Sequence, residues 1–262
     1  MTQQNPIKIT ICELSHEEGD FIHNWERLVN HVKAENSDLV LLPEMIFCPW
    51  FAVKSSFNPA TWQAAISSHD EWLSRFQELA PALVLGSRPV DADEKRLNEA
   101  FVWESEAGYQ AVHTKYYLPD EEGFWEASWY ERGDGNFNSI EIRDTKIGFM
   151  ICTDIWFFHH SRVYAKEGVH LIAHPRATQR SNLDKWLVAG RTASVVSGAF
   201  CISSNHVNPR GQEPNLGGMG WIINPDGEVL GLTSTKEPII TMEIDLNEAE
   251  RAKQTYPRYV KE

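Results

Sequence analysis

Apolar residues in the first third of the chain alternate between short continuous runs and a helical spacing. Residues 7–12, 38–43 and 82–87 are apolar runs that predict strands, and the run at 38–43 is typical of a strand covered on both faces. Residues 15–35 and 58–80 instead show the amphipathic spacing of helices. In the first of these helices the predicted buried positions are Ile22, Trp25, Leu28, Val29 and Val32.

The pattern changes after residue 98 and then returns to strand–helix alternation. Residues 99–118 predict a hairpin around Glu106–Gly108, and residues 119–137 have no clear period and predict a loop. Helices are predicted at 159–167 and at 182–198, the second with Asn182 as its N-cap. The remaining apolar runs predict strands at 146–152, 169–174, 199–204, 218–224 and 238–244, with a turn at 224–227.

Two groups of strands, each interleaved with helices, predict two mixed sheets. Each sheet would carry helices on one face, and the two bare faces would bury each other. We therefore expect an α+β fold, a four-layer αββα sandwich of two mixed β-sheets, with a doubly wound single sheet as the alternative. No low-complexity or Pro/Gly/Ser-rich linker divides the chain, so residues 1–262 are expected to form one domain.

The composition of the chain excludes some classes of binding partner from what we expect. The formal net charge is −13, whereas nucleic acids and anionic membranes require a basic footprint, so neither is an expected partner. No apolar run approaches the ~20 residues of a membrane-spanning helix, and residues 1–11 do not resemble a signal peptide. Cys12, Cys48, Cys152 and Cys201 are scattered and form no CxxC motif, which predicts reduced thiols and a cytoplasmic protein.

Three chemically useful side chains occur at predicted strand ends. Glu44 follows the strand at 38–43, Lys115 ends the second arm of the hairpin, and Cys152 ends the strand at 146–152. Functional groups gather at the carboxyl ends of strands in sheets with helical crossovers, so we expect the three to meet. A cysteine that serves only as a small buried hydrophobe is the alternative for Cys152 alone.

Together these three groups suit acyl transfer. A carboxylate can accept the proton of the attacking thiol, and an ammonium can stabilise the negative oxygen of a tetrahedral intermediate, helped by the backbone N–H after the nucleophile. A helix beginning at Cys152 would also favour its thiolate. The expected chemistry is attack on an amide-like carbon, followed by hydrolysis of a thioester.

The segments around these residues resemble the three signatures of the nitrilase superfamily, the carbon–nitrogen hydrolases. The likeness is carried by LVLLPE at Glu44, HTKYYLP at Lys115 and GFMICTDIWF at Cys152, in that order and 71 and 37 residues apart. The sequences ASVVSGAFCISSNHV and GGMGWIINPDGEVLG resemble the family's later helix, strand and hairpin, so the likeness covers essentially the whole chain.

The resemblance implies the αββα sandwich, Glu44 as general base, Lys115 as oxyanion stabiliser and Cys152 as nucleophile. It also implies a homodimer or larger homo-oligomer and no cofactor. A second glutamate often follows the lysine in this family. Glu126 matches it best, with Glu121 and Glu122 as competitors, and the backbone amide of Thr153 would complete the oxyanion hole.

The sequence around the nucleophile bears on the substrate. Cys152-Thr153-Asp154 resembles the amidase and carbamoylase branches rather than true nitrilases. Trp156 belongs to a segment that departs from the family pattern and is expected at the pocket wall. Arg176 is a candidate for binding a substrate carboxylate, with a surface or subunit-contact arginine as its alternative.

Two further features have weaker functional interpretations. Cys12, Cys48 and Cys201 are expected to be packing residues, with the pocket wall as the alternative for Cys48, which lies four positions past Glu44. His159-His160 suggests a metal site, but adjacent side chains point apart on a helix and no third ligand has a suitable spacing, so no metal is expected.

The expected function is hydrolysis of a linear amide or N-carbamoyl compound, with release of ammonia and with a small molecule as the only partner besides further copies of the chain. The acidic stretch 120–132 would suit an amine-bearing substrate and Arg176 an acid. Nitrile hydrolysis within the same family, a non-catalytic binding protein and a metal hydrolase are the alternatives.

Overall fold

The computed structural model describes residues 6–16, 21–209 and 211–260. Its first five strands form one half of the sheet together with the last strand. These strands are β1 (Ile7–Ser15), β2 (Leu39–Glu44), β3 (Leu83–Ala92), β4 (Lys95–Glu104), β5 (Gly108–Thr114) and β12 (Ile239–Ile244). The other half comprises β6 (Ile140–Ile142), β7 (Thr145–Phe149), β8 (Leu171–Arg176), β9 (Phe200–Val207), β10 (Trp221–Ile223) and β11 (Val229–Leu232).

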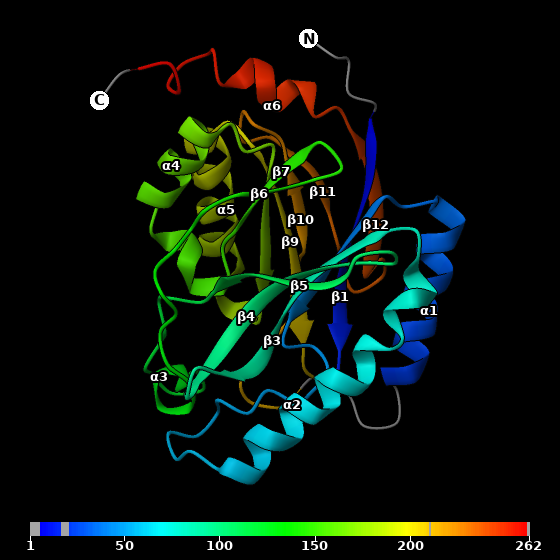
Figure 1. Ribbon diagram of the computed structural model, residues 1–262, viewed down its shortest axis with the longest axis vertical. Helices are drawn as coiled ribbons and strands as arrows, with labels where there is room; N and C mark the ends of the chain where they lie inside the picture. Colours follow the sequence, from blue (N-terminus) through cyan, green and yellow to red (C-terminus); the bar gives the residue numbers. More distant parts are fainter. Residues whose placement is uncertain (1–5, 17–20, 210, 261–262) are drawn as a thin grey trace.

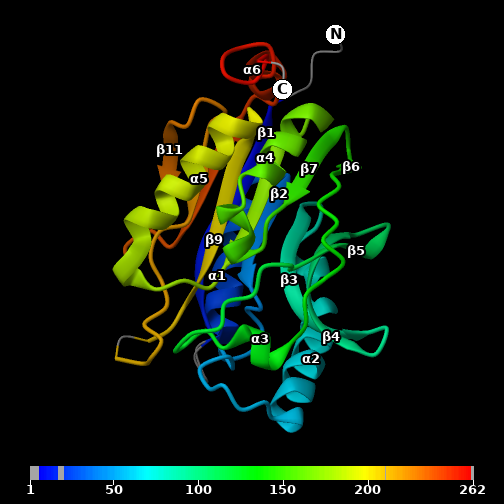
Figure 2. The same ribbon diagram turned by 90° about the vertical axis from the view of Figure 1, so that its left-hand side faces the viewer.

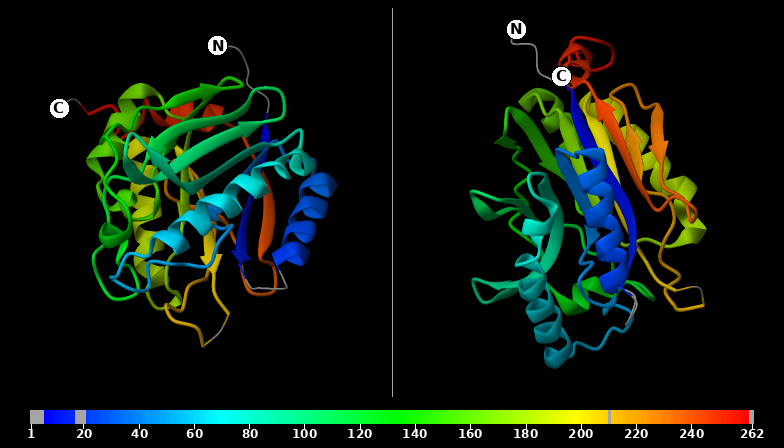
Figure 3. Two further views of the ribbon diagram at one scale, coloured as in Figure 1. Left: turned by 60° about the horizontal axis from the view of Figure 1, so that its bottom comes forward. Right: turned by 90° about the vertical axis from the view of Figure 1, so that its right-hand side faces the viewer.

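Helices cover the outer faces of both halves. The α-helices are α1 (Phe21–Glu35), α2 (Pro59–Leu73), α3 (Glu126–Trp129), α4 (His159–Glu167), α5 (Leu183–Ser197) and α6 (Asn247–Ala252). Short 3₁₀ helices are η1 (Phe76–Leu79), η2 (Cys152–Trp156) and η3 (Arg180–Asn182). Figure 1 shows α1 on one side and α4 with α5 on the other, with the strands between them. The end view in Figure 3 shows the same layering.

The two sheet halves are joined end to end as well as face to face. In the first half the order is β5-β4-β3-β2-β1, and β12 pairs with the other edge of β1. Residues 13–15 at the end of β1 then pair in parallel with residues 205–207 of β9. From β9 the order runs through β8 and β7 to β6, and β10 with β11 pairs beside β9. The predicted αββα sandwich is therefore confirmed, with its two sheets connected at one corner.

A period of two sorts the strand residues between layers. Ile9 and Ile11 of β1 lie in the core between the halves, whereas Cys12 and Leu14 pack with Trp25 of α1. In β2, Leu39 and Leu41 face the same inner core and Val40 and Leu42 face the helices. All six residues of β2 are buried, as expected for a strand covered on both faces.

Several element boundaries differ from the sequence prediction. The first helix begins at Phe21, and the predicted residues 17–20 lie outside the described part of the chain. Ile22 is exposed, which corrects its predicted burial, because Phe21 lies one turn before Trp25 and takes the apolar face instead. The second helix ends at Leu73 and is followed by η1, and the predicted loop at 119–137 contains the single turn α3.

Asn182 precedes α5 as predicted, but its side chain makes no capping hydrogen bond. Asn58 has that role at α2, where its side-chain oxygen accepts from the backbone N–H groups of Ala60 and Thr61. Figure 2 shows α5 and α4 lying over the strands of the second half.

Candidate active site

Glu44 reaches the inner side of the sheet because β2 is irregular at its end. The register of β2 against β3 shifts between Leu41 and Glu44. With strict alternation, Glu44 would point with Val40 and Leu42 towards the helices; the shift re-aims the side chain. The Glu44 carboxylate is fully buried, and its Oε1 accepts a hydrogen bond from Asn98 Nδ2 of β4 at 2.8 Å.

Lys115 lies between two buried carboxylates. Its Nζ is 2.8 Å from Glu44 Oε1 and 2.5 Å from Glu126 Oε2, and all three side chains are inaccessible to solvent. Lys115 directly follows β5, which runs parallel to β3 because both pair antiparallel with β4. The carboxyl ends of β2 and β5 therefore lie at one edge, which brings Glu44 and Lys115 together.

Of the three glutamates after Lys115, Glu126 is the one in contact with it. Glu126 begins α3, and its Oε2 also accepts a hydrogen bond from the hydroxyl of Tyr130. Glu121 and Glu122 are exposed. One oxygen of each buried carboxylate, Glu44 Oε2 and Glu126 Oε1, has no hydrogen-bond partner in the described structure.

The electrostatics of this cluster favour a charged lysine and a partly protonated glutamate. Burial opposes the charge on Lys115, but Glu126 and Glu44 outweigh it and raise the pKa of the ammonium. Burial raises the pKa of Glu126 to about 7, against the opposing effect of Lys115 and with a further increase from Glu44. Near neutral pH the cluster thus holds an ammonium and a carboxyl group poised to titrate.

Cys152 begins a strained turn rather than ending a strand. β7 stops at Phe149, and Cys152 is the first residue of η2 with φ of 45°. A non-glycine residue in the left-handed region is costly, and such residues cluster at functional sites. The predicted strand 146–152 is therefore too long, because β7 ends at Phe149 and the chain turns at Cys152 itself.

The pKa of the Cys152 thiol is raised by burial and by Glu44, against the opposing effects of Lys115 and a backbone hydrogen bond from Ala177. The helix that was expected to favour the thiolate is only the five-residue η2. Burial and Glu44 therefore favour the neutral thiol of Cys152.

Cys152 opens into a cavity of about 240 Å³. Thr153, Trp156 and Glu126 line it, as does Glu121, so three of the residues expected at the pocket do lie there. Lys185 of α5 also lines the cavity and contributes a cation. Cys48 is a packing residue as expected, in an aromatic cluster with Trp50 and Phe51, and its alternative placement at the pocket wall is wrong.

Arg176 matches neither of its expected placements. It is fully buried at the end of β8, which excludes a surface position in this chain, and it does not line the cavity. Its Nε donates to Ser203 Oγ at 2.9 Å, its Nη1 to Thr178 Oγ1, and its Nη2 to the carbonyls of Gly218 and Met219. The guanidinium therefore ties β8 to the segment before β10, and burial lowers its pKa to about 9.

Sequence reasoning did not identify Asn98 or Tyr130 as contacts of the two carboxylates, and no sequence signal distinguishes them. In the sequence, Asp154 served only to distinguish the amidase and carbamoylase branches from true nitrilases. In the structure it is fully buried and accepts hydrogen bonds from three backbone N–H groups, those of Ile151, Tyr116 and Tyr117. The sequence signal that could have identified Asp154 as part of the site is its position two residues after Cys152.

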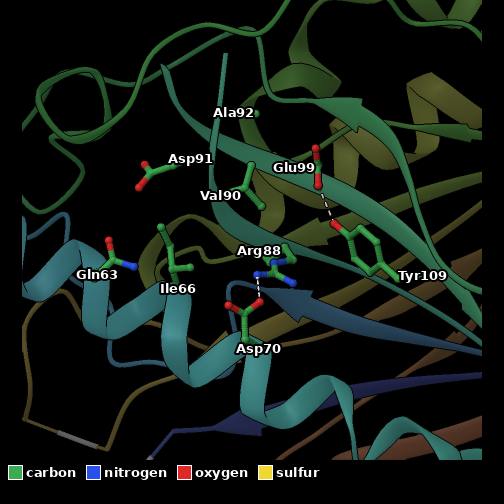
Figure 4. Close-up of a pocket in the computed structure, with 9 residues that line it drawn as sticks. All are labelled: Gln63, Ile66, Asp70, Arg88, Val90, Asp91, Ala92, Glu99 and Tyr109. Carbon is green, nitrogen blue, oxygen red and sulfur yellow. Dashed lines mark hydrogen bonds and ion pairs between the residues drawn. The ribbon is translucent and has the colours of Figure 1, made fainter. Parts of the chain in front are cut away.

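A second, larger cavity of about 400 Å³ lies outside this cluster, between α2 and strands β3 to β5. Figure 4 shows Arg88 at its centre, paired with Asp70, and Tyr109 paired with Glu99. The side chain of Asp70 is 58% exposed. The cavity holds charged groups but no nucleophile, so volume alone does not locate the chemistry.

The histidine pair at the start of α4 differs from expectation. The rings of His159 and His160 lie 3.9 Å apart instead of pointing away from each other, because both turn towards the hydroxyl of Tyr117. Within the described residues no group of three or more His, Cys, Asp or Glu side chains is arranged to hold a metal ion. None of the described helices is long and apolar enough to cross a membrane.

The geometry agrees with comparisons to known proteins. A sequence model of the family described as Carbon-nitrogen hydrolase matches residues 4–254. The chain belongs to this family. It is thus a member of the nitrilase superfamily on the amidase side, and an enzyme that hydrolyses non-peptide carbon–nitrogen bonds.

Named relatives of this carbon–nitrogen hydrolase are distant. It is 24% identical to an N-carbamoylputrescine amidase of Oryza sativa subsp. japonica, over 88% of this chain and 82% of the relative. It is 26% identical to a chloroplastic omega-amidase of Arabidopsis thaliana, over 95% of this chain and 70% of the relative. A carbon-nitrogen hydrolase from Helicobacter pylori G27 shares the fold, with a TM-score of 0.84, 23% identity and coverage of 97% and 94% of the two chains.

Proposed function

We propose that this enzyme hydrolyses a linear amide or N-carbamoyl compound through a thioester on Cys152 and releases ammonia. The observation that carries the proposal is the buried Glu44–Lys115–Glu126 cluster, in which Lys115 Nζ bridges two carboxylates beside the cavity that Cys152 opens into. The names of the Oryza and Arabidopsis relatives support an amide or carbamoyl substrate.

In the proposed first step, Sγ of Cys152 attacks the substrate carbonyl while Glu44 takes the thiol proton. A base is needed because the raised pKa leaves Cys152 as a thiol. Glu44 Oε2 suits this role, since it is the oxygen with no hydrogen-bond partner. The ammonium of Lys115 and the backbone N–H of Thr153 stabilise the oxyanion.

Collapse of the tetrahedral intermediate breaks the carbon–nitrogen bond. Glu44 returns its proton to the leaving nitrogen, so ammonia departs and an acyl thioester remains. Water then attacks the thioester carbon, Glu44 takes a proton from the water, and the acid and the thiol are released. With an N-carbamoyl substrate the product is a carbamic acid, which loses CO2 to give the amine.

Lys115 is held in place by Glu126 as well as by Glu44, so we propose Glu126 as the second functional glutamate. Its hydrogen bond from Tyr130 and its contact with Lys115 support this role over Glu121 and Glu122. Trp156 forms part of the cavity wall and packs against Trp186, with ring centroids 5.2 Å apart. We propose that these two rings bound the substrate chain.

Because Arg176 does not line the cavity, the preference for a substrate is inferred from the charged residues that do. Lys185 and Glu121 both line it, and both are exposed. A cavity of about 240 Å³ lies below the usual size of drug-sized ligand sites, which favours a short substrate chain. We propose that Lys185 holds a carboxylate at the far end of the substrate.

A substrate panel with ammonia detection tests the proposal. It runs from short aliphatic amides through dicarboxylic acid monoamides and N-carbamoyl amino acids to carbamoylputrescine and a simple nitrile. Ammonia from an amide or carbamoyl compound, lost when Cys152 is alkylated by iodoacetamide and unaffected by a chelator, is the expected result. Turnover of the nitrile alone, loss of activity with chelator, or no turnover of any member would contradict it.

We further propose that residues 1–262 form one domain, that the protein is cytoplasmic, and that it assembles as a homodimer or larger homo-oligomer. The family match over residues 4–254 supports the first proposal. Four free cysteines support a reducing compartment. Val163 of α4 and Val188 of α5 are exposed apolar side chains that support a contact between copies. Light scattering of the purified protein tests the assembly, and a monomer would contradict it.

A further inference from the structure

The Asp154 carboxylate connects the two segments that carry Lys115 and Cys152. Its Oδ1 accepts from the backbone N–H groups of Tyr116 at 3.3 Å and Tyr117 at 3.0 Å, the two residues after Lys115. Its Oδ2 accepts from the N–H of Ile151, the residue before Cys152, at 3.1 Å. One buried side chain therefore sets the spacing between these two segments.

His113 adds a fourth hydrogen bond to the same carboxylate. It lies on β5, two residues before Lys115, and its Nε2 is 3.1 Å from Asp154 Oδ2. Its other nitrogen, Nδ1, is 2.9 Å from the backbone carbonyl of Asn136. The His113 side chain is 2% exposed, so water does not replace either partner.

Both nitrogens of His113 face oxygen atoms. The ring therefore lies between Asp154 Oδ2 on one side and the backbone carbonyl of Asn136 on the other. Four hydrogen bonds, three of them from backbone N–H groups, meet on the two oxygens of Asp154. Loss of the Asp154 oxygens or of the His113 ring would leave buried polar groups without partners.

Side chains of α4 and of the segment after β5 surround the pair. On α4, burial lowers the pKa of His160 to about 4 and raises that of Tyr164. The pKa of Tyr117, in the segment after β5, is raised by partial burial and by Asp154. Phe137, whose ring centroid is 4.6 Å from that of His113, completes the surroundings.

We propose that Asp154 and His113 are positioning residues for the hydrolysis, because they hold the oxyanion-stabilising ammonium of Lys115 at a fixed distance from the sulfur of Cys152. Without the Asp154 carboxylate or the His113 ring, the segment after β5 and the segment before Cys152 lose part of their common tie. A displacement of about 1 Å in an active site is enough to reduce a rate by about 100-fold.

Four variants test this proposal, which rests on the proposed function. His113→Gln keeps an N–H donor for Asp154 that does not titrate, and His113→Leu removes it. Asp154→Asn keeps the shape of the side chain but replaces one acceptor oxygen with an NH2 group. That group cannot accept a hydrogen bond from the backbone N–H of Ile151 or of Tyr117, whichever it faces. His160→Gln is the matched control, because His160 stacks on the same Phe137 but bonds Tyr117 rather than Asp154.

The readouts are kcat and KM, measured below the thermal midpoint of each variant. We expect kcat to fall about 10- to 100-fold in Asp154→Asn and about tenfold in His113→Leu, with KM within about threefold. The kcat of His113→Gln should recover most of the loss seen in His113→Leu, because the glutamine amide can again donate to Asp154. His160→Gln should follow wild type.

A kcat for His113→Gln as low as that of His113→Leu would overturn the proposal, as would a kcat within twofold of wild type in both Asp154→Asn and His113→Leu. A wild-type protein that turned over nothing would instead refute the proposed function. Iodoacetamide alkylation of Cys152 then decides the positioning role without substrate. Displacement of Lys115 should slow alkylation at least threefold at pH 9 in His113→Leu but not in His160→Gln, and equal rates would overturn it.

Discussion

The two cavities of this enzyme differ in how the charged side chains near them are stabilised. Beside the cavity at Cys152, the side chains of Glu44, Lys115 and Glu126 are inaccessible to solvent, so each depends on the others for stabilisation. In the cavity between α2 and β3, buried Arg88 pairs with Asp70, whose side chain is largely exposed and solvated. The interdependent charges thus lie beside the smaller cavity. The comparison teaches that mutual dependence of buried charges, rather than volume, singles out the candidate site.

The largest effect is expected for Cys152→Ala. Without the sulfur no thioester forms, so ammonia release should fall by at least about 1,000-fold, since removal of a nucleophile leaves only binding and oxyanion stabilisation. The measurement is ammonia released per folded protein, with Cys48→Ala as the matched control, because Cys48 is buried outside the cavity. Equal losses in the two variants would remove the distinction between the cysteines.

Lys115→Met tests the dependence of the charges on one another. It should lower kcat by about 1,000-fold through loss of oxyanion stabilisation. It should also destabilise the fold by about 3–5 kcal/mol, because it leaves two buried carboxylates without their cation. Urea unfolding measures the stability. A loss below about 1 kcal/mol would show that the cluster is less coupled than its geometry indicates.

Glu126→Gln should reduce kcat about 10- to 100-fold by loosening Lys115. It also has a defined effect on pH dependence, because the pKa of Glu126 is raised to about 7 in the folded protein. In wild type this group contributes stability below about pH 4.5 that is lost as pH rises through 7. Thermal midpoints should therefore show the variant gaining on wild type between pH 5 and pH 8. A constant difference between them would contradict the raised pKa.

Lys185→Glu should change substrate preference more than rate. Reversal of the charge at the cavity should raise KM for a dicarboxylic acid monoamide about tenfold and leave KM for an uncharged aliphatic amide within about twofold. Lys166→Glu, at the end of α4, serves as a control for net charge. An equal change in KM for both substrates would assign Lys185 no part in recognition.

The smallest effect is expected in the other cavity. Arg88→Gln leaves behind Asp70, a solvated carboxylate, so unfolding free energy should fall by no more than about 1 kcal/mol, and kcat should stay within twofold. Activity assays and urea unfolding check both values. A tenfold loss of kcat would mean that Arg88 influences Glu44 through neighbouring Ser87 and Asn98, and the two cavities would no longer be independent.

The sequence was most informative where a local pattern determines the structure. The layers followed from apolar periodicity, and Glu44 and Lys115 meet because both follow strands whose carboxyl ends share an edge. Their convergence needed no detail beyond strand direction. The resemblance of three separate segments to one family further predicted that Cys152 lies near Glu44 and Lys115.

The errors occurred where tertiary contacts override local pattern. Arg176 has the chemistry to bind a substrate carboxylate, but whether a guanidinium faces a cavity or its own backbone depends on Gly218 and Met219, over 40 residues away. Similarly, His159 and His160 converge because of Tyr117 on another segment. The left-handed conformation of Cys152 is not predictable either, because nothing in its residue type favours it.

The corner at which β1 meets β9 has a consequence for how activity is acquired. Glu44 and Lys115 come from the half of the sheet before it, and Cys152 comes from the half after it. Neither half alone carries all three residues proposed to react, and β12 returns from the second half to finish the first. We therefore expect turnover to report assembly, because a chain whose halves have formed but not docked would lack the proposed site.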